Sequence, residues 1–387
     1  MNARFVNAPF VCGRGCLATL PEVSGRRVAL FIDSRALLDE KLKVITCGLD
    51  QAGISWRVVA DIGGEPTVHD ALRPLDEMAE FRPDTIVAIG GGSVLDTAKA
   101  SWVFYEHPDI GMEKAFTPFA IPALGAKAKL IAVPTTSGTG SETTCVAVLI
   151  EPDTRTKRLM MSGELVPDLA MLDADLVSSM PASVAAHSGL DALSHALEAA
   201  VSTVSSGLVV SIAVQAALDI FRLLPASVRS QPGEGQFHAA REGMHHASAM
   251  AGMAINNSCT GLAHALDQIG PLLGLPHGLV CGMLLPHTVA YTSPHPVYAR
   301  IAQYLGHTGS ERSLCDALVD ELLALNRDVG LPSSFEAMGI DGPAFQACID
   351  SALAAGLESG AAKFSPRPLT QPQAREILMH AWSGTKE

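Results

Sequence analysis

Residues 85–99 read TIVAIGGGSVLDTAK, and this stretch determines how we expect the first half of the chain to fold. Residues 85–89 are a short, continuously apolar run rich in β-branched side chains, which is typical of a strand buried on both faces of a parallel sheet. Three glycines follow, and the residues from Ser93 to Lys99 have the character of the first turns of a helix. A strand, a glycine turn and a helix in this order predict one unit of an open α/β sheet.

Comparable apolar runs occur before and after this unit. We expect parallel strands at residues 27–33, 55–60 and 129–134, and a few closing strands at 145–151, 158–161 and 169–173. Helix-like segments separate the first of these runs, which gives a βαβ rhythm. We therefore predict a Rossmann-like, doubly wound parallel sheet for an α/β domain over residues 1–180.

The second half of the chain has a different pattern. From about Pro181, long Ala- and Leu-rich segments with a 3.6-residue spacing predict helices over residues 182–202, 207–224 and 234–255. We interpret Leu224-Pro225 as the end of a helix and Pro276-His277-Gly278 as a turn. The prediction for residues 181–387 is an all-helical domain.

Composition excludes several classes of partner. The 387 residues contain 27 Lys+Arg and 40 Asp+Glu, a net charge of −13, so we expect neither nucleic acid nor an anionic membrane surface as a partner. Eight cysteines are scattered without a C-x-x-C pair, which favours a reduced, cytoplasmic location over a disulfide framework. A small molecule or another subunit is the expected partner.

Two polar loops follow expected strands and have the composition of phosphate-binding loops. Glycines allow close backbone approach, and the N–H groups at a helix start favour an anion. The alternative is a pair of structural turns. The expected cofactor-binding residues are Gly90, Gly91, Gly92, Ser93, Asp96 and Lys99 in the first loop and helix, and Thr135, Thr136, Thr139 and Ser141 in the second loop.

Asp33 ends the first expected strand and has two interpretations. Its carboxylate is suited to accept hydrogen bonds from an adenosine ribose and to repel a 2′-phosphate, which favours NAD over NADP. Alternatively it caps a helix, because Ser34 and Arg35 lead into a helical pattern.

A second group of residues has the chemistry of a metal site. Asp191 and His195 are four residues apart in a helical pattern and project from one face, where they form either half of a metal site or a simple salt bridge. His264 and His277 follow later in the chain. One carboxylate and three imidazoles suit Fe²⁺ or Zn²⁺, but the spacing does not by itself show that the two pairs converge.

These motifs, in this order and spacing, resemble the signatures of the iron-containing (group III) alcohol dehydrogenase family, which shares its architecture with dehydroquinate synthase-like proteins. The resemblance extends over essentially the whole chain. It implies an NAD-binding α/β domain, an all-helical metal and substrate domain, and a cleft between them. It also implies Asp191, His195, His264 and His277 as metal ligands, and a homodimer or larger homo-oligomer.

One position departs from the family pattern. Many members carry a second histidine four residues after the ligand that matches His264, where this chain has Gln268 with Asp267 beside it. Glutamine does not titrate near neutrality, so bound water, a ribose hydroxyl or Asp267 are the candidates for the proton route.

The resulting hypothesis is reversible hydride transfer between a small primary alcohol, or its aldehyde, and NAD. Asp191, His264 and His277 are the expected catalytic residues, with minor roles for Gln268 and Asp267. The alternatives are a hydroxyacid–oxoacid transhydrogenase that retains NAD, a reductase for a polar or anionic aldehyde, a polyol-phosphate dehydrogenase or sugar-phosphate cyclase, and a binding protein without activity.

Overall fold

The computed structural model describes residues 5–33, 39–153 and 156–385. The chain divides into two compact units. One is Val6–Met180, called here the N-terminal unit. The other is Pro181–Glu387, which Phe5 joins by packing on its core and which is called the helical unit.

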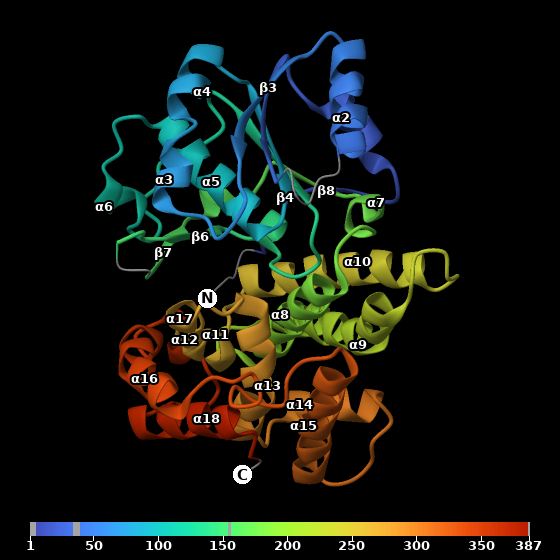
Figure 1. Ribbon diagram of the computed structural model, residues 1–387, viewed down its shortest axis with the longest axis vertical. Helices are drawn as coiled ribbons and strands as arrows, with labels where there is room; N and C mark the ends of the chain where they lie inside the picture. Colours follow the sequence, from blue (N-terminus) through green and yellow to red (C-terminus); the bar gives the residue numbers. More distant parts are fainter. Residues whose placement is uncertain (1–4, 34–38, 154–155, 386–387) are drawn as a thin grey trace. The chain divides into compact units, whose positions relative to one another are not determined.

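The N-terminal unit is built on a six-stranded, all-parallel sheet in the order β1-β8-β5-β4-β2-β3 (Figure 1). Two further strands, β6 and β7, pair with each other in antiparallel fashion. The strands are β1 (Phe10–Cys12), β2 (Arg27–Ile32), β3 (Ser55–Asp61), β4 (Thr85–Gly90), β5 (Lys129–Pro134), β6 (Val146–Ile150), β7 (Lys157–Met161) and β8 (Leu169–Leu172).

Both faces of the main sheet are covered, as the continuous apolar runs predict. Along β2, Ala29 and Phe31 pack on one face with α4 and α5, while Val28, Leu30 and Ile32 pack on the other face with α2. Side chains alternate between the two sides of a strand, so every position of such a run is buried. The helices of this unit are α1 (Leu20–Val23), α2 (Asp39–Gln51), α3 (Val68–Leu72), α4 (Leu75–Phe81), α5 (Gly92–Glu106), α6 (Met112–Ala115) and α7 (Ala174–Val177).

The described part of the helical unit contains helices and no β-strand. Its core is one large cluster of Ala, Leu, Ile and Val side chains, and α8, α9 and α10 pack against one another. The helices are α8 (Ala182–Val201), α9 (Gly207–Arg229), α10 (Phe237–Asn256), α11 (Leu262–Leu266), α12 (Ile269–Leu273), α13 (His277–Thr292), α14 (Pro296–Tyr304), α15 (Glu311–Asp328), α16 (Gly342–Gly356), α17 (Gly360–Lys363) and α18 (Gln371–Ser383).

Helix α9 is long and apolar enough, by length and composition alone, to cross a bilayer, and it is the one such helix among the described residues. It packs on α8 and α10, and Val209, Ala213 and Ile220 are among its buried residues. The core helix of a bundle passes the same test, so this feature is weak support for a membrane span.

Three details differ from the sequence-based predictions. Strand β8 does not follow the main sheet but lies within it, between β1 and β5. Helix α9 continues through Pro225 to Arg229 instead of ending at Leu224, so this proline does not mark a helix end. His277 is the first residue of α13, with Pro276 as its extended N-cap, instead of lying in an irregular turn.

Candidate functional site

The expected metal ligands come from three helices of the helical unit. Asp191 and His195 lie one turn apart on α8, His264 lies on the short α11, and His277 begins α13. Helix α13 packs against both α8 and α11, which brings the four side chains together.

One carboxylate oxygen is the meeting point of this group. Oδ1 of Asp191 lies 3.6 Å from Nε2 of His195, 3.4 Å from Nε2 of His264 and 3.3 Å from Nε2 of His277. The Asp191 side chain is only 3% exposed. The two pairs that sequence spacing left separate therefore converge on one point.

This arrangement fits a divalent cation. At metal–ligand distances of about 2.0–2.2 Å, two ligands of a tetrahedral site lie about 3.3–3.6 Å apart, which matches the three separations above. In addition, Oδ1 of Asp191 and Nε2 of His264 are buried atoms without a hydrogen-bond partner. Buried polar atoms are normally satisfied, so these two require a partner that the protein itself does not supply.

The pKa shifts of Asp191 and His195 agree with this interpretation, whereas Cys281 and Glu198 raise the pKa of His264 well above its usual range against the effect of burial. Burial on its own raises the pKa of Asp191, but its close contacts with His195, His277 and His264 hold that pKa well below its usual range. Burial lowers the pKa of His195 to about 4, against the opposing effect of Asp191. An ionised carboxylate and a neutral imidazole are the forms that bind metals.

Two further carboxylates hold the remote ring nitrogens of two of these histidines. Oε2 of Glu198, on α8, lies 2.5 Å from Nδ1 of His264, and Oε1 of Glu198 accepts the Ala263 N–H at 2.6 Å. Asp267 Oδ2 contacts Nδ1 of His277. Glu198 was not among the site residues predicted from the sequence, although its position three residues after His195 places it on the same helix face.

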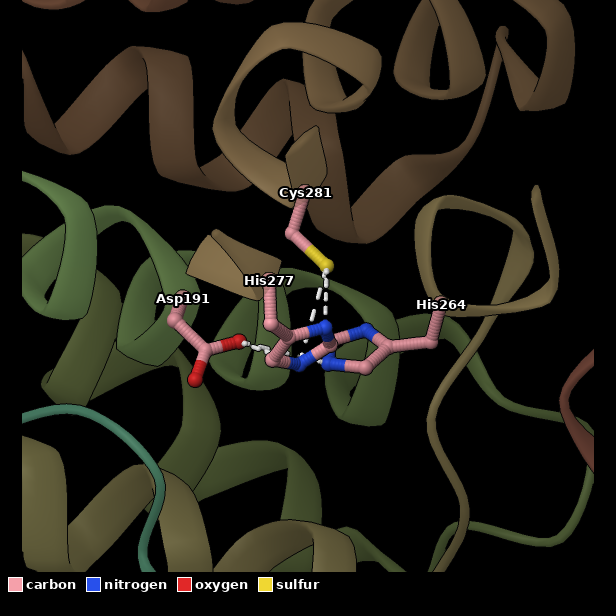
Figure 2. Close-up of side chains that lie close together, drawn as sticks. All are labelled: Asp191, His264, His277 and Cys281. Atoms are coloured by element: carbon pink, nitrogen blue, oxygen red, sulfur yellow. Dashed lines mark hydrogen bonds and ion pairs between the residues drawn. The ribbon is translucent and has the colours of Figure 1, made fainter. Parts of the chain in front are cut away.

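Cys281 is a second residue near the site that was not predicted from the sequence. Figure 2 shows its side chain pointing toward His277, and Sγ lies 3.7 Å from Nδ1 and 3.9 Å from Nε2 of that ring. One possible ligand atom from each of Asp191, His264, His277 and Cys281 lies within 4.8 Å of all the others. The i, i+4 spacing from His277 on a helix is the signal that predicts this neighbour.

Gln268 and Asp267, the candidates for minor roles, are joined to each other. Nε2 of Gln268 donates to Oδ1 of Asp267 at 3.3 Å, and the Asp267 side chain is 2% exposed. The buried carboxylate is thus placed between Gln268 and His277.

The two polar loops of the N-terminal unit lie side by side. Strands β4 and β5 are neighbours, and the Thr135 N–H donates to the Gly90 carbonyl at 2.9 Å. A Cβ added at Gly91 would lie 3.3 Å from Thr136, and one at Gly92 would lie 2.8 Å from Thr139. Glycine therefore allows the two loops to approach closely where they touch, at the carboxyl edge of the sheet.

The start of α5 is available to a ligand. Gly91 is its N-cap and provides no side-chain cap, and the first turn, which includes Ser93, contains no acidic residue. Close by in the second loop, the buried Oγ1 of Thr135 has no hydrogen-bond partner. N–H groups at a helix start together with an unsatisfied hydroxyl favour an anion such as a phosphate.

Asp96, Ser141 and Lys99 have structural partners instead. Asp96 accepts hydrogen bonds from Ser141 Oγ at 2.6 Å and from the Val148 N–H at 2.9 Å. Both groups belong to the chain that follows β5, so Asp96 ties α5 to that chain.

The Lys99 side chain is completely buried, which corrects our expectation that it contacts a phosphate. Its ammonium donates to the carbonyls of Thr144 at 2.7 Å and Val146 at 2.9 Å, and to Thr144 Oγ1 at 3.3 Å. Burial lowers the pKa of Lys99 to about 8. With three acceptors inside the protein, this ammonium is committed to the fold.

Asp33 directly follows β2 and is half-buried. Its position at the carboxyl end of a strand beside β4 is compatible with the ribose interpretation. The alternative as a helix cap involves Ser34 and Arg35, which lie outside the described residues.

Models of known protein families match almost the whole chain. The family model described as "Iron-containing alcohol dehydrogenase" matches residues 7–174, and the model described as "Fe-containing alcohol dehydrogenase family, C-terminal" matches residues 185–382.

Individual proteins show the same similarity. The NADPH-dependent butanol dehydrogenase of Clostridium saccharobutylicum is 31% identical, over 97% of this chain and 96% of that protein. The 1-propanol dehydrogenase of Salmonella typhimurium is 32% identical, over 98% and 99%. The solved structure of an iron-containing alcohol dehydrogenase from Thermococcus thioreducens has a TM-score of 0.89 at 31% identity, over 98% of this chain and 99% of that one.

Proposed function

The chain belongs to the iron-containing alcohol dehydrogenase family, and from this premise we propose that it transfers hydride reversibly between a small primary alcohol, or its aldehyde, and NAD. Relatives named for butanol and 1-propanol support a short, unbranched alcohol and favour this reaction over the transhydrogenase and anionic-aldehyde alternatives. The observation that carries the proposal is the convergence of three imidazole nitrogens on Asp191 Oδ1.

Asp191, His195, His264 and His277 are the proposed metal ligands, with Fe²⁺ as the first choice and Zn²⁺ as the second. When bound, the cation supplies Lewis-acid polarisation of the substrate oxygen. The mixed oxygen and nitrogen donors suit both ions, and Asp191 reduces the net charge of the loaded site. Glu198 and Asp267 orient the rings of His264 and His277.

Residues 1–180 are the proposed NAD-binding domain, and residues 181–387 the metal and substrate domain. The contact between Gly91, Gly92 and the Thr136–Thr139 loop supports a pyrophosphate site at the start of α5. Hydrogen bonds from main-chain N–H groups, Ser93 and Thr135 are the proposed recognition elements. One of the relatives is named NADPH-dependent, so the relatives do not favour NAD. The proposed preference for NAD over NADP therefore rests on Asp33.

Location and assembly follow from less specific features. No disulfide joins any of the eight cysteines, all of which lie in the described residues, and this supports a reducing, cytoplasmic environment. Among the described residues, β1 is an outer strand of the main sheet, so its free edge supports pairing in a homodimer or larger homo-oligomer.

The test is a reconstitution experiment. The chelated, metal-free protein is loaded with Fe²⁺ or Zn²⁺ and assayed on a panel of primary alcohols and aldehydes with NAD(H) and NADP(H). We expect activity only with bound metal, and we expect His264→Ala to lose both metal and turnover while its circular dichroism is unchanged. Full turnover after chelation, with metal content measured at zero, would overturn the proposal.

A further inference from the structure

His277 is the most exposed member of the proposed metal site. Its side chain is 35% exposed, against 3% for Asp191, 5% for His195 and 11% for His264. It is also the first residue of its helix, and its N-cap residue, Pro276, makes no side-chain capping bond. A half-exposed imidazole at a helix end has more freedom to rotate than a core histidine, so its orientation needs a separate restraint.

Asp267 provides this restraint. Its Oδ2 contacts Nδ1 of His277, and its Oδ1 accepts the Gln268 amide at 3.3 Å. The Asp267 main chain is fixed as well, because its N–H donates to the Ala263 carbonyl at 3.0 Å at the end of α11. The carboxylate is therefore held by the same short helix that presents His264.

The contact also determines which ring nitrogen of His277 carries the proton. A carboxylate at Nδ1 accepts the Nδ1 proton, and the lone pair of Nε2 then faces Asp191 Oδ1, 3.3 Å away. Glu198 performs the same task for His264, with Oε2 at 2.5 Å from Nδ1. Two of the three imidazoles thus have a dedicated carboxylate on the nitrogen remote from the site, as metal-binding histidines commonly do.

We propose that Asp267 is a positioning residue for metal retention: it holds His277 in the orientation and tautomer that keep the divalent cation bound. This inference rests on the proposed metal site. It assigns to Asp267 a role different from proton transfer, for which the residue was a candidate from sequence. Gln268 donates a hydrogen bond to the same carboxylate and so helps to hold Asp267 in place.

The test measures metal affinity. Zn²⁺ binding to wild type, Asp267→Asn and Asp267→Ala is measured by competition with a chromophoric chelator, and the Co²⁺-loaded proteins are compared by their visible absorption. We expect both variants to bind Zn²⁺ about 10–100-fold more weakly, with an altered Co²⁺ spectrum, and Asp267→Glu to recover part of the affinity.

Glu321→Gln is the matched control. Glu321 Oε1 lies 2.9 Å from Nε2 of His307, a carboxylate–histidine pair that is partly exposed and outside the metal cluster. This variant should bind Zn²⁺ as wild type does. If Asp267→Asn does not fold, Gln268→Ala removes a hydrogen bond to the same carboxylate and should weaken Zn²⁺ binding in the same direction.

The outcomes separate this inference from the proposed function. Wild-type Zn²⁺ affinity and Co²⁺ spectrum in Asp267→Asn would overturn the positioning role, and a loss of turnover at full metal occupancy would assign Asp267 to proton transfer instead. Weakened metal binding in the Asp267 variants supports the inference even if wild type oxidises none of the alcohols tested, a result that would count against the function alone.

Discussion

Gly278 lies directly against the main chain of His187. A Cβ added at Gly278 would be 2.3 Å from the His187 carbonyl oxygen and 3.2 Å from Cβ of Asp191. The first turn of α13 thus approaches α8 closely enough that only glycine fits, and the obstacle is main chain that cannot rotate away. This close approach sets the separation between Asp191 on α8 and His277 on α13.

We predict that Gly278→Ala separates the two helices and weakens the metal site. Overpacking of this kind costs about 1–3 kcal/mol of folding free energy, and the displacement of His277 should lower Zn²⁺ affinity in addition. Thermal unfolding and chelator competition measure the two effects. Gly207→Ala is the control, since a Cβ at Gly207 meets nothing within 4 Å. Wild-type affinity and Tm in Gly278→Ala would contradict this account.

The strands that carry the nucleotide loops could be predicted from the sequence closely. Strand β5 has the bounds expected from its apolar run and β4 extends one residue beyond its run, to Gly90, because turn-forming residues limit both runs. The place of β8 between β1 and β5 could not be predicted, because strand order depends on pairing between segments far apart in the chain. The continuation of α9 through Pro225 could not be predicted, because packing of the surrounding helix overrides the low helix propensity of proline.

For the site, the residue types were predictable and their partners were not. Asp191 and His195 follow from helical spacing, but the roles of Glu198 and Asp267 depend on how α11 and α13 pack on α8. For Lys99 a role was predicted that the structure does not support, because a lysine beside a glycine loop suggests phosphate binding. Its burial under the chain that leads into β6 is a tertiary effect that local sequence does not contain.

The buried Lys99 gives a second prediction. Lys99→Met leaves the carbonyls of Thr144 and Val146 without their donor, and each unsatisfied buried group costs about 1–3 kcal/mol. We expect a clearly lower Tm, with unchanged NAD affinity in the protein that remains folded. Unfolding is followed by circular dichroism and NAD binding by titration calorimetry. A variant with wild-type Tm and weakened NAD binding would restore the phosphate role that we rejected.

A third prediction concerns acid stability and His287. Burial, with a smaller contribution from His380, lowers the pKa of His287 from 6.5 to about 4. Above pH 6.5 the residue is neutral in both states and has no effect. As the pH falls from 6.5 toward 4, the unfolded chain takes up a proton that the folded chain does not, so the free energy of unfolding decreases.

His287→Gln should remove this acid sensitivity. Between pH 7 and pH 5 the wild type should lose about 2 kcal/mol more than the variant, a difference that urea unfolding at the two pH values measures. The difference in free energy of unfolding between wild type and variant at pH 7 measures any change in packing and is subtracted from the difference at pH 5. An identical loss in both proteins would show that His287 titrates normally in the folded state.

The last prediction concerns cofactor choice at Asp33, which follows β2 at the carboxyl end of the sheet. If its carboxylate accepts hydrogen bonds from the adenosine ribose, Asp33→Gly loses a charged hydrogen bond of about 1.5–3 kcal/mol with NAD, which is about tenfold or more in kcat/KM. The same change removes the charge that repels a 2′-phosphate, so kcat/KM with NADP should rise. Initial rates with both cofactors give the ratio directly. Asp109→Gly, in an exposed turn, is the matched control and should leave the ratio unchanged. An unaltered ratio in Asp33→Gly would mean that Asp33 does not contact the ribose and that NAD preference must arise elsewhere.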